Sequence, residues 1–99
     1  MSLPIGSQNR TDDGVIGASG KKIRVYALIV RSDSDGASAV SVYNGTSTAG
    51  TLMDVINVAT ASTTVRINYA GGLLFPSGCF VDVDANTAFV TAILEQEGV

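Results

Sequence analysis

The chain has 99 residues, enough for one domain with a modest core and too few for two. An apolar fraction of 45% against 15% charged residues exceeds what so small a domain can bury by itself, which favours oligomerisation or docking on a larger surface. The net charge of −3 argues against nucleic-acid binding, which usually needs a basic surface.

The first twenty residues differ from the rest of the chain. Residues 1–20 are rich in Gly, Ser, Asn and Asp, and their apolar positions are too few to order the segment alone. We interpret residues 1–20 as an extended arm, with a short strand near residues 15–18, and residues 21–99 as the folded domain. Such an arm can bind a neighbouring sheet edge, and its candidate contact residues are Leu3, Ile5, Arg10, Val15 and Ile16. A loose tail before an ordinary first strand is the alternative.

The strongest strand pattern follows the arm, in Lys22–Arg31 (KIRVYALIVR). Alternation predicts one apolar face formed by Ile23, Val25, Ala27 and Ile29. The other face is apolar too in the second half of the strand, through Tyr26, Leu28 and Val30. A strand covered on both sides is central between layers or lies at a subunit contact, so we assign these three residues to a contact. A solvated turn over Ser32–Gly36 ends the strand; its Asp-x-Asp-Gly resembles half of a calcium loop without the rest.

Three further strands are predicted in the middle of the chain. Ala37–Tyr43 alternates and ends at the turn pair Asn44-Gly45, where both residues tolerate positive φ. Thr51–Ala59 is apolar enough for a strand, but its alternation breaks at Val55-Ile56, which leaves its inward face open. Thr63–Tyr69 alternates without a break, and its inward face is formed by Thr63, Val65, Ile67 and Tyr69.

The segment Ala70–Leu94 is the most informative part of the chain. A Gly-Gly corner leads into a short apolar run and a Pro-Ser-Gly turn, and two alternating strands follow, joined at residues 84–86. We predict that these two strands form a β-hairpin at the edge of a sandwich. Phe80, Phe89 and Ile93 lie on the faces that we assign to contacts, whereas Asp82 and Asp84 are interpreted as solvated outward carboxylates.

No catalytic constellation is visible. Histidine is absent, the only cysteine, Cys79, lies in an alternating strand as a small apolar residue would, and no nucleophile elbow or phosphate loop occurs. We therefore predict a protein that is not an enzyme, with no metal and no cofactor. Met1–Pro4 lacks the blocks of a secretory signal, and no apolar run approaches the ~20 residues that span a membrane, so we expect cytoplasmic synthesis and no membrane contact.

The regular succession of strands predicts an all-β, single-domain β-sandwich of roughly seven or eight short antiparallel strands. KIRVYALIVRS, VYNGTSTAG and the closing GGLLFxxGCFVDVD with TAFVT together resemble small virion structural proteins of tailed bacteriophages, the decoration or cement proteins of capsids. The resemblance covers about three quarters of the chain. It implies a jelly-roll-like sandwich that assembles as a trimer or dimer on the capsid surface, with the major capsid protein as its partner.

Two functions follow as expectations. The first is a cement protein that stabilises the phage head by bridging neighbouring capsomers. The alternative is a receptor- or glycan-binding module of a head or tail fibre. Tyr43 and Phe80 are the aromatic residues that the second function would use, if both point outward.

Overall fold

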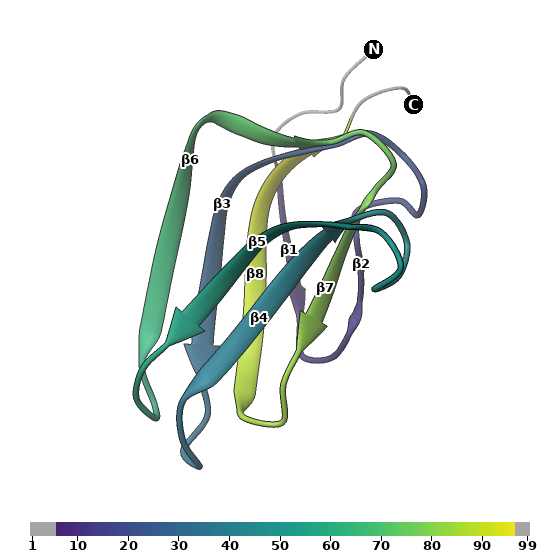
Figure 1. Ribbon diagram of the computed structural model, residues 1–99. Helices are drawn as coiled ribbons and strands as arrows, with labels where there is room; N and C mark the ends of the chain where they lie inside the picture. The colour runs from purple at the N-terminus through teal and green to yellow at the C-terminus, as the bar shows by residue number, and fades with distance from the viewer. Residues whose placement is uncertain (1–5, 97–99) are drawn as a thin grey trace.

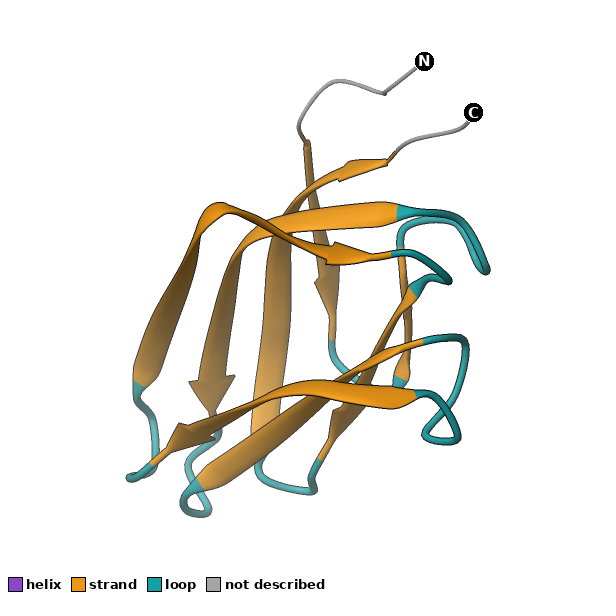
Figure 2. Cartoon of the chain, turned by 45° about the horizontal axis from the view of Figure 1, so that its top comes forward, coloured by secondary structure: helices purple, strands orange, loops and turns teal. Residues whose placement is uncertain are grey.

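The computed structural model describes residues 6–96, which form eight strands and no helix (Figure 1). The strands are β1 (Gly6–Arg10), β2 (Gly14–Ile16), β3 (Ile23–Ser32), β4 (Ser38–Asn44), β5 (Thr51–Val58), β6 (Thr64–Phe75), β7 (Cys79–Val83) and β8 (Thr87–Gln96). They form two four-stranded antiparallel sheets packed as two layers, as Figure 2 shows. The predicted all-β sandwich is confirmed.

The topology is that of a jelly roll. Sheet A has the strand order β1-β8-β3-β6, and sheet B has the order β2-β7-β4-β5. β1 pairs with β8, β2 with β7, β3 with β6 and β4 with β5. The described chain is therefore one long hairpin rolled into a sandwich. Among the described strands, only the β4–β5 connection joins neighbours in one sheet. Every other connection crosses from one sheet to the other.

This topology corrects the predicted hairpin over β7 and β8. The two strands lie in different sheets: β7 pairs with β2 and β4, whereas β8 pairs with β1 and β3. Residues 84–86 therefore form an arch between the layers. A hairpin and an arch both place alternate residues against one core, so periodicity alone does not distinguish them.

The core lies between the sheets and consists mainly of β-branched side chains. Fully buried side chains come from all strands except β1, and the largest of them is Phe75 at the end of β6. Cys79 is buried in this cluster, as its place in the alternation predicts, and burial raises the pKa of its thiol to about 12. The inward face predicted for residues 63–69 is confirmed for Val65, Ile67 and Tyr69, which pack against the core. Thr63 precedes β6, and its hydroxyl bonds to Thr60 and to the Ala61 carbonyl in the loop.

A β-bulge at Tyr26 reverses the alternation of β3. The pairing with β8 steps from Val25–Leu94 to Ala27–Ile93, which leaves Tyr26 without a partner position. One extra residue moves every later side chain to the opposite face. Leu28 and Val30 therefore point into the core. Ile29, predicted to share a face with Val25, is partly exposed, and Ala27 is buried but lies outside the core cluster.

Opposite the bulge, β6 turns a corner. Four residues of β6, 69–72, lie between the positions paired with Ala27 and Val25. Gly71 and Gly72 have φ values of 75° and 85°, which side chains other than glycine rarely adopt. The Gly-Gly corner is thus present, but it lies inside one long bent strand, visible in Figure 1, and does not separate two strands.

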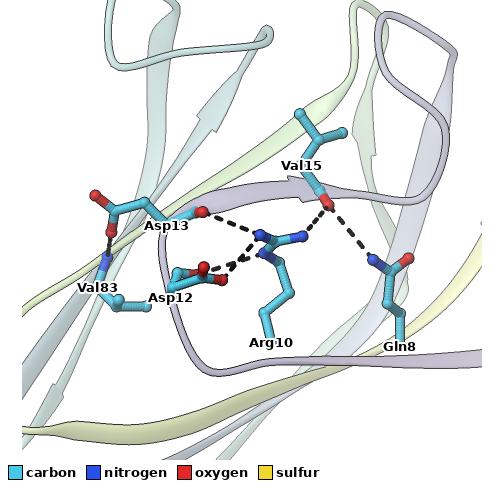
Figure 3. A network of polar contacts seen from close by, with 6 residues as sticks. All are labelled: Gln8, Arg10, Asp12, Asp13, Val15 and Val83. Carbon is cyan, nitrogen blue, oxygen red and sulfur yellow. Dashed lines mark hydrogen bonds and ion pairs between the residues drawn. The ribbon is translucent and has the colours of Figure 1, made fainter.

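The described part of the predicted arm is paired with the chain's own sheets. β1 forms the edge of sheet A beside β8, and β2 forms the edge of sheet B beside β7, with Ile16 in the core. Figure 3 shows how the turn between them is held: the Arg10 guanidinium donates to the Asp12 carboxylate at 2.9 Å and to the carbonyls of Asp13 and Val15 at 3.0 and 3.3 Å. Contact of this segment with a neighbouring molecule stays a prediction.

Carboxylates organise the turns at one end of the sandwich. Asp33 accepts a hydrogen bond from the backbone N–H of Asp35 at 2.8 Å, which closes the turn after β3. Asp84 accepts from the N–H groups of Ala39 and Asn86 and from the Thr87 hydroxyl, at 2.8 to 3.0 Å. Partial desolvation raises the pKa of Asp84, but these hydrogen bonds outweigh it and leave that pKa below its ordinary value. Asp84 is therefore a structural acceptor and not only a solvated charge.

Candidate binding surface

The structure sorts the predicted contact residues into three groups. Ile16, Leu28 and Val30 are 0% exposed and belong to the core, so they offer no surface to a partner. For Leu28 and Val30 the reason is the bulge at Tyr26, which turns them inward. The partly exposed residues are Arg10, Val15, Tyr26, Phe80, Phe89 and Ile93. Leu3 and Ile5 lie outside the described residues.

An apolar row crosses the outer face of sheet B. Val15 on β2 lies opposite Phe80 on β7, Phe80 lies opposite Tyr43 on β4, and Tyr43 lies opposite Leu52 on β5. The side chain of Leu52 is 51% exposed, and Val55, also on β5, is 41% exposed. We call Val15, Phe80, Tyr43 and Leu52 the sheet B row. It spans all four strands of the sheet.

Sequence reasoning missed Leu52. The pairing of β4 with β5 shifts between Val42–Asp54 and Tyr43–Leu52, so Met53 is an extra residue that places Leu52 on the outer face with Val55. Asp54, Ile56 and Val58 alternate on the other face, where Ile56 and Val58 are in the core. The disturbed alternation at Val55-Ile56 did not reveal this shift, because the extra residue is Met53 and Val55 and Ile56 lie on alternate faces.

The outer face of sheet A carries a second apolar group. After the bulge, Ile29 on β3 points away from the core. Phe89 and Ile93 on β8 lie on the same outer face of sheet A. The pairing places Ile93 opposite Ala27 and Phe89 opposite Arg31. Beside them, the Tyr26 hydroxyl donates to the Glu95 carboxylate at 3.1 Å. We call Tyr26, Ile29, Phe89 and Ile93 the sheet A group.

The two outer faces carry opposite charge. On sheet A, Arg24, Arg31 and Arg66 alternate with inward residues, and Glu95 is the only carboxylate of these strands. Their guanidinium groups donate to the Gly71 carbonyl, the Thr64 hydroxyl and the Asn68 side chain, so in the described part of the chain none pairs with a carboxylate. The four strands of sheet B contain no Lys or Arg.

Carboxylates gather on the outer side of sheet B. Asp82 lies on the outer face of β7, next to Asp13 of the β1–β2 turn. Desolvation raises the pKa of Asp82, and the charge of Asp13 and a hydrogen bond with it raise it further. The Asp13 carboxylate also accepts from the N–H of Val83 at 2.7 Å, which fixes it at the end of β7. The outer side of sheet B thus holds two neighbouring carboxylates and no cation from its own strands.

The described residues 6–96 contain no group of three His, Cys, Asp or Glu side chains that could hold a metal ion. They also contain no helix that is long and apolar enough to cross a membrane. Comparisons with family models, curated proteins and solved structures found no match to this chain. The geometry of the two outer faces is therefore the basis for the functional argument.

Proposed function

We propose that the protein is a non-enzymatic structural protein of a bacteriophage virion, a capsid cement or decoration protein that bridges neighbouring capsomers. The observation that carries the proposal is the presence of large apolar side chains on both outer faces of the sandwich. Contiguous exposed apolar residues with a polar surround are typical of surfaces that bind other proteins. The resemblance of residues 23–94 to phage decoration proteins adds the particular setting.

A cement must hold two neighbours at once, and this molecule offers separate surfaces for that purpose. The sheet B row and the sheet A group lie on opposite layers of the sandwich. Jelly rolls are common in viral capsids, although the architecture alone does not define a function. In this proposal the protein is made in the host cytoplasm, assembles as a homo-oligomer and binds the major capsid protein at the capsid surface.

The test is binding to particles that lack the protein. Purified chain is added to such particles, bound copies are counted by quantitative mass spectrometry, and the temperature at which the shell opens is measured. A cement gives hundreds of copies for each particle and a higher opening temperature. Leu52→Lys with Val55→Lys places charges on the most exposed apolar positions and should abolish both effects. Thr48→Lys, in the exposed β4–β5 loop, is the control that should bind normally.

A receptor- or glycan-binding module is the second candidate, favoured by one specific feature. Tyr43 and Phe80 are opposite each other on the outer face of sheet B, with Asp82 two residues along β7. Aromatic faces that bind sugar rings, together with carboxylates that accept hydrogen bonds from hydroxyls, are the usual elements of such sites. A few copies at a vertex or tail, together with glycan binding that Phe80→Ser abolishes, would support this function and exclude the cement.

A further inference from the structure

We propose that copies of this chain associate head to tail, with the outer face of sheet A of one copy against the outer face of sheet B of the next. The occupant of each face is thus a second copy of the chain. The inference does not depend on the capsid setting, because it concerns only the two faces of the sandwich.

Charge complementarity is the first argument. The outer face of sheet A presents three arginines, and the outer face of sheet B presents Asp82 beside Asp13 with no cation in any of its strands. Pairing a face with its own kind would bring like charges together, which is unfavourable in an interface. Pairing sheet A with sheet B brings arginines to carboxylates. The charges therefore favour contact between unlike faces over a two-fold contact between like faces.

The distribution of apolar side chains is the second argument. Each face has its large apolar residues on adjacent strands near the charged ones: Phe89 is opposite Arg31 on sheet A, and Phe80 is two residues from Asp82 on sheet B. A buried apolar centre with polar groups around it is the usual arrangement of a protein interface. Apolar contact supplies the affinity, at about 25 cal/mol per Å² removed from water, and the charges define which faces meet.

Contact between unlike faces has a consequence for assembly. After the first contact one copy still has a free sheet B face and the other a free sheet A face, so the interface repeats from copy to copy unless rotation closes a ring. Two variants, each reversed in charge on a different face, should then associate with each other although neither associates alone. A two-fold dimer uses only one of the two faces, so it survives charge reversal on the other.

Four variants test the inference by analytical ultracentrifugation of the free protein, with melting curves to show that each variant is folded. Arg31→Glu with Arg66→Glu reverses the face of sheet A. Asp82→Lys with Ser41→Lys reverses the face of sheet B, because Ser41 lies opposite Asp82 on β4. The third variant combines all four substitutions. The control, Lys21→Glu with Thr48→Lys, makes both kinds of charge change in exposed loops.

We expect the wild type and the control to associate with a Kd that rises at least about tenfold from low to high salt. Each single-face variant should be monomeric, because both of its faces then carry charge of the same sign. Their equimolar mixture should associate again, since each face of one variant meets the opposite charge on the other, and the combined variant should associate for the same reason. A monomeric wild type, a mixture that stays monomeric, or association that survives reversal of one face would overturn the inference. A second copy and a capsomer would compete for the same two faces. None of these results needs capsid particles, so failure of this inference is distinguishable from failure of the cement proposal.

Discussion

Removing the hydroxyl of Tyr69 should loosen one side of the sandwich. The Tyr69 hydroxyl on β6 donates to the Asp54 carboxylate on β5 at 2.6 Å. β5 belongs to sheet B and β6 to sheet A, and each is the edge strand of its sheet, so this hydrogen bond joins the two layers along one edge. Tyr69→Phe keeps the ring that packs against the core and removes only the bond.

The size of the effect follows from the type of bond. A hydrogen bond to a charged group contributes about 1.5–3 kcal/mol to stability. Both side chains are only partly buried, so water replaces part of the lost contact and we expect a cost at or below the lower end of that range, about 1–1.5 kcal/mol. For a domain of this size, each kcal/mol corresponds to roughly 4–8 °C in Tm. Thermal unfolding at neutral pH should show this decrease.

The same contact predicts an alkaline signature. Burial, followed by the hydrogen bond and the charge of Asp54, raises the pKa of Tyr69 above its ordinary value. The folded chain therefore keeps a proton that the unfolded chain loses once the pH exceeds about 10. The stability from this contact is therefore fully present below about pH 10, and because the folded state binds more protons above it, stability falls as the pH rises from there. Tyr69→Phe should make this alkaline decrease shallower.

Tyr43→Phe is the matched control, because the Tyr43 hydroxyl has no hydrogen bond within residues 6–96. Its loss should leave Tm nearly unchanged. A double-mutant cycle of Tyr69→Phe with Asp54→Ala should give a coupling energy of about 1 kcal/mol. The reasoning is refuted if the two substitutions are additive, if Tyr69→Phe is as mild as Tyr43→Phe, or if the alkaline slope is unchanged.

Three further substitutions test the fold. Arg10→Ala removes the hydrogen bonds that hold the β1–β2 turn and should cost about 1–2 kcal/mol in urea unfolding, with Arg10→Lys recovering only part of it. Asp84→Asn should lower the free energy of unfolding at neutral pH and make its decrease in acid shallower. The lowered pKa of Asp84 stabilises the fold at a pH above the unfolded pKa, and this stability is lost as the pH falls through the folded pKa. The Cys79 thiol should not react with a thiol reagent in the native state, and fast labelling of the folded protein would contradict its buried position. Cys79→Ser should lower the free energy of unfolding by about 1–3 kcal/mol, because it buries a hydroxyl.

The residues that the sequence predicted well are those whose environment depends on local alternation. Val65, Ile67 and Tyr69 face the core as predicted, and so does Cys79, because period two is a property of a single strand. The low helix propensity of a chain rich in Val, Ile, Thr and Ser likewise determined the all-β class. These features need no knowledge of which strands are neighbours.

The pairing of strands was decided only by the tertiary structure. Whether β7 and β8 form a hairpin or an arch depends on which partners compete for their backbone groups, and β1 to β4 supply those partners from far away in the sequence. The bulge at Tyr26 arises from the register between β3 and β8, so it turned Leu28 and Val30 inward without a local signal. The sheet B row has the same origin: Val15, Tyr43, Leu52 and Phe80 become neighbours only when four strands are aligned across a sheet. Cross-strand register depends on hydrogen bonds between distant residues, and a single strand's pattern does not contain it.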